Sequence, residues 1–189
     1  MAVPAEKPRY SFADVLAWDD SERVEIIDGE AFMMATPLTV HQRISGRLFW
    51  EIYDFLRGKI CEVFHAPFGV RLFEQDGDRP EDVDTMVEPD LTVVCDPEKL
   101  DKFGCKGAPD MVIEILSPSN RRHDLGVKYR LYERAGVREY WVVDPEKKTV
   151  QVCRLEDGLY GVPEVYLTGK VPVGLWEDFR VDLGPVFAE

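Results

Sequence analysis

The chain has 189 residues, of which 45% are hydrophobic and 31% charged, as is usual for a globular protein. Its net charge of −13, taken alone, argues against a nucleic-acid partner. The sequence shows no apolar signal segment at its start and no stretch long and apolar enough to span a membrane. We therefore expect a soluble, cytoplasmic protein without membrane contact.

The first third of the chain predicts two helices and a hairpin. Ser11 is a suitable N-cap for a short helix. Asp28-Gly29 separates two apolar runs within residues 24–35, which is a good signal for a β-hairpin. Apolar residues recur every three or four positions between residues 39 and 57, and Gly58 follows, so we expect a long amphipathic helix there.

The rest of the chain predicts strands around one further helix. A turn and N-cap at residues 117–120 begin a helix that we expect to run to about Ala135. We predict a single α+β or mixed α/β domain, residues 1–189, with a central mixed sheet flanked by helices. Its core is expected at about 24–145, with a C-terminal hairpin and cover at 146–189. The predicted strands are 61–73 with a bend at Pro67 or Gly69, 87–95, 110–116, 138–144, 149–154 and 159–167.

The four cysteines are spread along the chain and form no CxxC pair. Three of them lie in strand-like runs, where cysteine is usually a small core residue. We therefore predict plain thiols, and neither a zinc site nor a disulfide. The four are Cys61, Cys95, Cys105 and Cys153.

Positive charge is concentrated in the two longer helical segments. Residues 117–138 hold six basic and two acidic side chains, and residues 39–60 hold four basic and two acidic ones. Arginines here are candidates for phosphate contacts, because neutralising phosphates supplies most of the non-specific affinity for nucleic acid. The candidates are Arg43, Arg47, Arg121 and Arg122. For Arg43 and Arg47, a solvated helix face is an equally good interpretation.

Glu114 interrupts a short apolar run that otherwise predicts a buried strand. Glutamate is almost never fully buried unless it is paired, because removing an unpaired carboxylate from water is costly. The sequence offers two kinds of partner for Glu114. One is Lys128 on the following helix, and the other is a metal ion shared with a second carboxylate.

Helical spacing places Lys128 near the middle of an apolar stripe formed by Leu125, Tyr129 and Tyr132. We therefore expect Lys128 to face the sheet. Two structural alternatives remain open. The lysine stem could pack while its ammonium reaches water at the edge, or Lys128 could pair with Asp124 one turn earlier.

Asp90 lies near the start of the predicted strand 87–95. If that strand neighbours 110–116, Asp90 and Glu114 can converge on one face, where a proton or a cation must join them. Oxygen ligands without a His/Cys cluster favour Mg²⁺ or Mn²⁺. We predict such an ion on both carboxylates and the backbone carbonyl of Ile115. It would supply an attacking water and stabilise developing negative charge, with Lys128 assisting.

These residues resemble a known pattern. Pro89-Asp90, a spacer and Glu114-Ile115-Leu116 resemble the PD-(D/E)XK signature of restriction-type nucleases. Longer blocks around them resemble the Uma-type family of restriction endonucleases over roughly residues 24–145. The resemblance implies a restriction-endonuclease-like fold, Mg²⁺ dependence and often a homodimer. The blocks are Glu88–Leu91, Gly107–Ser119, Asp124–Tyr129 and Gly136–Pro145.

The sequence departs from the superfamily signature at Leu116, where a lysine is usual. The resemblance implies that the lysine has moved to the following helix, which matches Lys128. It also implies a site glutamate in the N-terminal hairpin, which matches Glu25, although an outward position on an alternating strand explains Glu25 equally well. His41 opens the first long helix and could approach the site, although a lone histidine is more often structural.

We therefore expect a Mg²⁺-dependent endonuclease that hydrolyses DNA. Asp90 and Glu114 would bind metal, Lys128 would assist and Glu25 would be accessory, with His41 and Asp124 as further accessory candidates. The alternative is a nuclease fold kept as a catalytically inactive module for nucleic-acid binding or protein assembly, which the acidic body of the chain favours. A direct ion pair between Lys128 and Glu114 that closes the site without an ion, even when metal is supplied, would favour that module.

Overall fold

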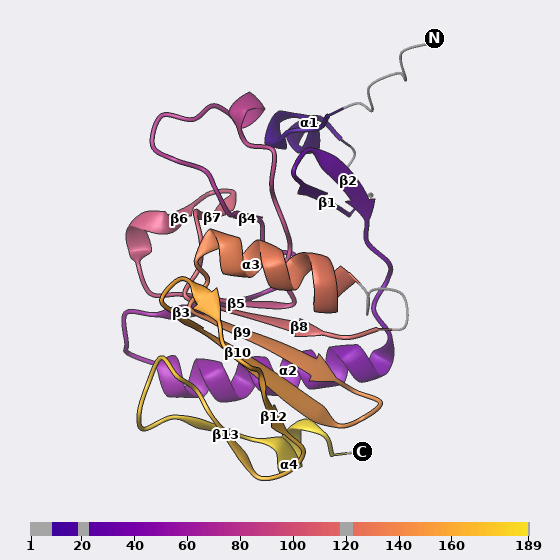
Figure 1. Cartoon of the computed structure of the whole chain (residues 1–189), viewed down its shortest axis with the longest axis vertical. Coiled ribbons are helices and arrows are strands. Elements are labelled where there is room, and N and C mark those ends of the chain that lie inside the picture. The colour runs from indigo at the N-terminus through magenta and orange to yellow at the C-terminus, as the bar shows by residue number, and fades with distance from the viewer. Residues whose placement is uncertain (1–8, 19–22, 118–122, 189) are drawn as a thin grey trace.

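The computed structural model describes residues 9–18, 23–117 and 123–188. Its centre is a seven-stranded sheet in the order β11-β10-β9-β8-β5-β3, with β12 also paired to β10. β8 and β9 are parallel and their neighbours antiparallel, which confirms the predicted mixed sheet (Figure 1). The strands are β3 (Glu62–His65), β5 (Leu91–Val94), β8 (Met111–Ile115), β9 (Glu139–Asp144), β10 (Thr149–Glu156), β11 (Leu159–Tyr160) and β12 (Glu164–Tyr166).

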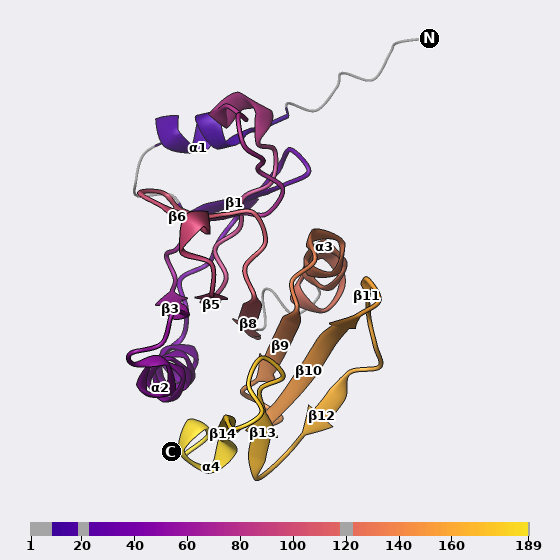
Figure 2. The same cartoon turned by 90° about the vertical axis from the view of Figure 1, so that its left-hand side faces the viewer.

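Helices cover both faces of this sheet. The long helix α2 (Thr39–Leu56) lies on one face, and α3 (Tyr129–Ala135) lies on the other (Figure 2). Alternate side chains of β8 divide between the two sides. Met111, Ile113 and Ile115 pack in the cluster that contains α2 residues. Val112 packs with Leu131 and Tyr132 of α3, so the alternation directs Glu114 towards α3.

The N-terminal part builds a smaller layer beside the sheet. As predicted, β1 (Val24–Ile27) and β2 (Glu30–Met33) form a hairpin, which turns at Asp28 and Gly29 with φ of 50° and 78°. These positive φ values suit the Asp-Gly turn that joins twisted strands. Isolated bridges join Ile26 to Met86 and Val70 to Val87. The neighbouring elements are α1 (Phe12–Ala17), β4 (Val70–Arg71), η1 (Pro80–Asp82), η2 (Pro97–Lys99), β6 (Leu100–Asp101) and β7 (Gly104–Lys106).

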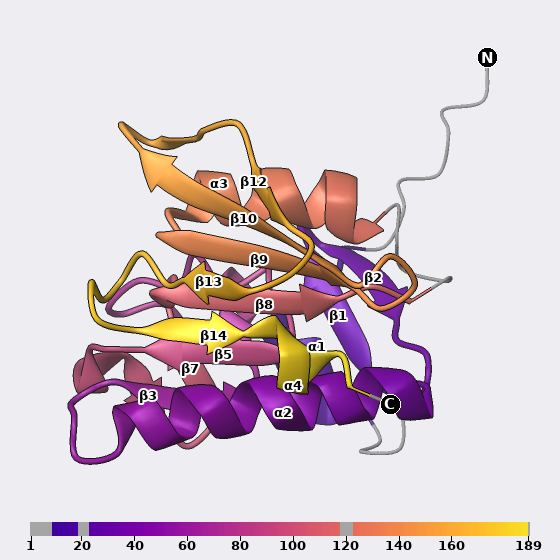
Figure 3. The same ribbon diagram turned by 90° about the horizontal axis from the view of Figure 1, so that it is seen from below.

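The C-terminal segment packs over α2 and the sheet (Figure 3). It contains β13 (Lys170–Pro172), β14 (Arg180–Asp182) and α4 (Leu183–Val186). Val181 and Leu183 are buried in the same cluster as Leu48 and Ile52 of α2. The preceding hairpin turns at Asp157 and Gly158. No helix within the described residues is long and apolar enough to cross a membrane.

Cys61 and Cys95 form a disulfide, so the prediction of plain thiols is wrong for this pair. β3 and β5 pair antiparallel with Glu62 opposite Val94, and the two cysteines follow at the next register position. Strand pairing therefore brings together two residues that are 34 positions apart in the chain. Cys105 and Cys153 are free thiols, as predicted, and both are buried.

The helix predicted up to Ala135 is not α-helical throughout. Its described part starts with a π-helical segment, η3 (His123–Lys128), and is α-helical from Tyr129. A π turn holds more residues than an α turn, so the 100° spacing behind the predicted stripe fails there. Leu125 was expected to face the sheet but is 39% exposed, whereas Lys128 is buried.

Candidate active site

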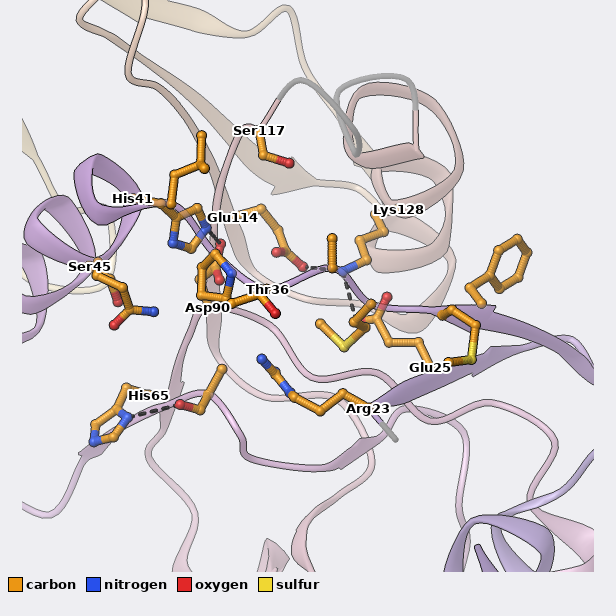
Figure 4. A pocket seen from close by; sticks show the side chains of 18 of the residues that line it. Arg23, Glu25, Thr36, His41, Ser45, His65, Asp90, Glu114, Ser117 and Lys128 are labelled. Atoms are coloured by element: carbon orange, nitrogen blue, oxygen red, sulfur yellow. Dashed lines mark hydrogen bonds and ion pairs between the residues drawn. The ribbon is translucent and has the colours of Figure 1, made fainter. Parts of the chain in front are cut away.

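A cavity of about 740 Å³ lies where the β1–β2 hairpin, the first half of α2 and the adjoining ends of β5 and β8 meet (Figure 4). Carboxylates, a lysine and a histidine lie at one side, and apolar side chains of β2 and the following segment form another wall. The lining charged residues are Arg23, Glu25, His41, His65, Asp90, Glu114 and Lys128.

Asp90 and Glu114 face each other across the antiparallel pair β5–β8. Leu91 lies opposite Ile113, which places Asp90 and Glu114 at the next register position. The Oδ2 atom of Asp90 accepts a hydrogen bond from the backbone N–H of Ile115 at 2.7 Å, across the same strand boundary. The two strands are therefore neighbours, which was the condition for Asp90 and Glu114 to lie on one face.

Lys128 joins two buried carboxylates. Its Nζ lies 2.8 Å from Oε1 of Glu114 and 2.8 Å from Oε1 of Glu25, and Figure 4 shows the ammonium between them. All three side chains are at most 4% exposed. The Lys128 side chain thus points inward as predicted, and its ammonium remains buried between these partners.

Further hydrogen bonds fix both glutamates. The hydroxyl of Tyr132 donates to Oε1 of Glu114 at 2.7 Å, and the backbone N–H of Glu88 donates to Oε1 of Glu25 at 2.9 Å. Arg23 in turn binds Oε2 of Glu88 at 2.7 Å. Glu25 therefore links the N-terminal hairpin to the chain just before β5, and the outward position considered for it is not observed.

The electrostatics of Glu114 are unusual for a glutamate. Burial, together with the charges of Asp90 and Glu25, raises its pKa from 4.5 to about 7, against the lowering effect of Lys128. Burial and the neighbouring Glu114 also hold the pKa of Tyr132 well above 10, so its hydroxyl stays a neutral donor. A carboxyl group whose pKa is shifted by both burial and specific charged neighbours is typical of functional sites.

His41 approaches the site from the first turn of α2. Its Nε2 lies 3.0 Å from Oδ2 of Asp90. Burial alone would lower the pKa of His41, but the hydrogen bond and charge of Asp90 outweigh this and leave the pKa above 6.5. Nδ1 of His41 is buried without a hydrogen-bond partner among the described residues. A buried polar atom that lacks a partner is uncommon, and here it lies at a cavity wall.

The oxygen atoms at this site are of the kind that bind a hard divalent cation such as Mg²⁺. Within the described residues, the hydrogen bonds to the two carboxylates end on Oδ2 of Asp90 and Oε1 of Glu114, which leaves one oxygen of each for another ligand. Both residues line the cavity. No group of three or more His, Cys, Asp and Glu side chains suited to a metal occurs in the described part of the chain. An ion here would rely on two carboxylates, backbone oxygen and water, as Mg²⁺ commonly does.

The arginines proposed for phosphate contacts have different surroundings. Arg43 is exposed on α2. The guanidinium of Arg47 donates to the backbone carbonyls of Val186, at 3.2 Å, and Ala188. Phosphate binding by either stays a prediction. Arg121, Arg122 and the side chain of Asp124 lie outside the described residues, so the Asp124–Lys128 alternative is not tested.

Sequence reasoning assigned no role to Tyr132, Arg23 or Glu88. Tyr132 follows Lys128 by four positions, a spacing that places both on one face of a helix, and that spacing could have identified it. The contact between Arg23 and Glu88 spans 65 positions, and no local pattern could have shown it.

Comparisons with known proteins found one matching family model, a relative of similar sequence and a solved structure of similar fold. A family model described as "Uma2: Putative restriction endonuclease" matches residues 12–180. The uncharacterized protein slr1290 of Synechocystis sp. (strain ATCC 27184 / PCC 6803 / Kazusa) is 29% identical over 127 residues. That match covers 66% of this chain and 63% of the relative, so this chain spans less than two thirds of that protein's length.

A solved structure shares the fold. The crystal structure of "a putative nuclease belonging to DUF820" from Anabaena variabilis ATCC 29413 superposes with a TM-score of 0.74. The match covers 94% of this chain and 97% of that chain, at 20% identity. At this identity the similarity shows the fold alone, and it confirms the predicted nuclease-like architecture.

Proposed function

This chain belongs to the Uma2 family, and we propose that it is a Mg²⁺-dependent nuclease that hydrolyses phosphodiester bonds of DNA at the cavity beside Asp90 and Glu114. The observation that carries this proposal is the cross-strand pair of carboxylates, with Lys128 beside them, lining one cavity. The family match and the nuclease-like fold support the reaction class.

Asp90, Glu114 and the carbonyl of Ile115 would hold the ion. A bound Mg²⁺ supplies an activated water and stabilises negative charge on the phosphate. The chain's own residues hold this site in shape. The backbone N–H of Ile115 and His41 fix Oδ2 of Asp90, while Lys128 and Tyr132 fix Oε1 of Glu114.

Lys128 has a second role in this proposal. Its ammonium is held by Glu25 as well as by Glu114, so it keeps its place at the cavity when Glu114 turns to a metal. A fixed cation next to a scissile phosphate stabilises charge that develops there, and such preorganised groups contribute strongly to catalysis. Glu25 acts in this account as a positioning residue.

The test is conversion of supercoiled plasmid DNA to nicked and linear forms with Mg²⁺ or Mn²⁺. We expect activity that EDTA abolishes and that Asp90→Asn reduces by at least about 100-fold, as removal of a metal ligand implies. Asp110→Asn is the matched control, because Asp110 is a strand-end carboxylate that binds the N–H of Cys95 and Arg138 and does not line this cavity. Equal nicking by wild type and Asp90→Asn would contradict the proposal.

One observation favours a second function. Lys128 contacts Glu114 directly, as expected of a catalytically inactive module for nucleic-acid binding or protein assembly. Titration with Mg²⁺ separates the two functions. Metal binding that is lost in Asp90→Asn supports the nuclease, whereas DNA binding with neither metal binding nor nicking supports the module. A homodimer, proposed from the family resemblance, is tested by sedimentation of the full chain.

A further inference from the structure

An aromatic strip extends from the cavity along the outer side of α2. We define the aromatic strip as Phe49, Trp50 and Tyr53 of α2 with His65 at the end of β3. The ring of Phe49 packs edge-on against His65, with centroids 5.2 Å apart, and lies parallel to Tyr53 at 5.8 Å. Trp50 is 65% exposed and Tyr53 is 51% exposed.

The strip is continuous with the candidate active site. Phe49 and His65 both line the cavity, and so do Ser45 and Gly46 one turn earlier on α2. Figure 4 shows Ser45 and His65 across the cavity from Lys128. A Cβ atom added to Gly46 would meet nothing within 4 Å, so the surface between the cavity and Trp50 is open. A ligand that leaves the cavity on this side passes onto aromatic rings.

The charges around the strip are mixed. Arg43 and Arg57 are exposed on this side of α2, but Arg57 pairs with Asp54 at 2.6 Å. Lys59 lies over the ring of Phe55. The whole chain carries a net charge of −13. Affinity for duplex DNA usually comes from basic side chains that neutralise many phosphates. The charges around the strip are poorly suited to this. Affinity must come mainly from the faces of the rings.

The shape of the site points the same way. A cavity of about 740 Å³ has the size of a small-molecule pocket, and the side chains of Asp90 and Glu114 within it are 16% and 3% exposed. A duplex keeps its bases stacked inside a broad cylinder, so it presents no base face to Phe49 or Trp50. A single strand can insert one backbone segment and stack its unpaired bases on aromatic side chains, largely independently of sequence.

We propose that the aromatic strip is a base-stacking platform, through which the site selects single-stranded polynucleotides over duplexes. The proposal rests on the proposed nuclease function, since it names the form of nucleic acid that enters the cavity. Phe49 and His65 would hold the base next to the reacting phosphate, and Tyr53 and Trp50 would hold bases further along the strand.

The test is fluorescence anisotropy of labelled oligonucleotides with the full-length protein in EDTA, where no cleavage interferes. The probes are a single DNA strand of about 12 nucleotides, within the site sizes known for single-strand binding, its blunt duplex, and the RNA strand of the same sequence. We expect either single strand to bind at least about tenfold more tightly than the duplex, because each stacked base contributes a factor of this order or more.

Substitutions locate the binding surface. Trp50→Ala and Tyr53→Ala should each weaken single-strand binding about tenfold, and Trp50→Phe should retain most of it, because a phenyl ring still stacks. Phe103→Ala is the matched control, because Phe103 is an aromatic residue 41% exposed outside the cavity lining. Unchanged thermal melting of the variants shows that a loss of binding is not a loss of folding.

The outcomes separate this proposal from the nuclease proposal. Duplex binding equal to or tighter than single-strand binding overturns the platform, as does unchanged binding by Trp50→Ala and Tyr53→Ala, whether or not plasmid is nicked. A dimer that dissociates on Trp50→Ala without any oligonucleotide binding also overturns it and makes the strip a protein interface. Single-strand binding that depends on Trp50, without cleavage of any strand in Mg²⁺, supports the platform and contradicts the nuclease.

Discussion

Two glutamates on the neighbouring parallel strands β8 and β9 are almost equally buried. Glu114 is 2% exposed and Glu139 is 1% exposed. They lie towards opposite ends of the strand pair, because Glu139 is opposite Met111 while Glu114 is opposite Val142. Burial raises the pKa of both. Burial alone therefore does not distinguish a structural carboxylate from a candidate catalytic one.

Their partners do distinguish them. Glu139 accepts a hydrogen bond from Nε1 of Trp141 at 2.6 Å and is absent from the lining of the cavity. Glu114 is held by Lys128, faces Asp90 across the strands and lines that cavity. A buried glutamate that accepts an indole N–H and lies away from the cavity suits a structural role. Glu114 shares the ammonium of Lys128 with Glu25 and lies beside Asp90. Such a cluster of interacting charged groups is typical of a catalytic site.

The largest expected effect is on activity. Glu114→Gln should reduce plasmid nicking by at least about 100-fold, because the amide oxygen is a poor substitute for a charged metal ligand. Glu139→Gln keeps the size and one acceptor oxygen of a glutamate that is equally buried, and should nick at the wild-type rate. Initial rates at equal enzyme concentration measure both. If Glu139→Gln also loses activity, the contrast between the two residues disappears.

The second effect is on stability. Lys128→Met leaves Glu25 and Glu114 buried without their cation, and removal of one partner from a buried ion pair typically costs about 3–5 kcal/mol. The free energy of unfolding, measured in urea, should fall by about this amount. Adding Glu114→Gln to Lys128→Met should restore part of the loss, because one unpaired carboxylate is then removed. A double variant less stable than Lys128→Met alone would show that the cluster is held differently.

A smaller loss is expected from Tyr132→Phe. The substitution removes the only hydroxyl that binds Glu114 among the described residues and keeps the aromatic ring. Loss of a buried hydrogen bond to a charged or polar partner costs about 1–3 kcal/mol. Urea unfolding measures the cost. No loss of stability would mean that Lys128 alone satisfies Glu114.

The smallest effect is a pH dependence at Glu139. Burial raises its pKa above 4.5, while Trp141 and Arg154 lower it less strongly. The folded protein therefore keeps this proton at pH values where the unfolded chain has lost it. Stability should fall as the pH rises from about 4.5 to the raised pKa, and then level off. Glu139→Gln should flatten this part of the curve of unfolding midpoint against pH. An unchanged slope in that variant would assign the titration to another group.

Local patterns predicted much of the site. The buried strand around Glu114 followed from a short apolar run, and the inward position of Lys128 followed from a helical spacing of about 3.6 residues. Asp90 followed from its place at a strand start. Glu25 needed the family resemblance, because its partner Lys128 lies 103 positions away. Distant pairings of this kind depend on the order of strands in the sheet, which local sequence patterns do not reveal.

The same limit explains the errors. Cys61 and Cys95 meet because β3 pairs with β5, whereas the prediction of thiols used the lack of a CxxC pair and an expected reducing cytosol. Leu125 was placed on the buried face by assuming a regular helix, but the chain there is π-helical. The inward position of Lys128 was correct because it lies at the junction with α3, where regular geometry resumes.

The π-helical segment makes the position of Lys128 a matter of chain length as well as residue type. A π turn holds about one residue more than an α turn, and one residue corresponds to about 100° of rotation around a helix. Deleting one residue from η3, such as Gly126, would allow a regular α-helix. It would also rotate Lys128 relative to the residues before it by about 100°. The number of residues between Glu114 and Lys128 therefore matters as much as their identities, because an insertion or deletion of one residue in η3 would turn the lysine away from Glu114.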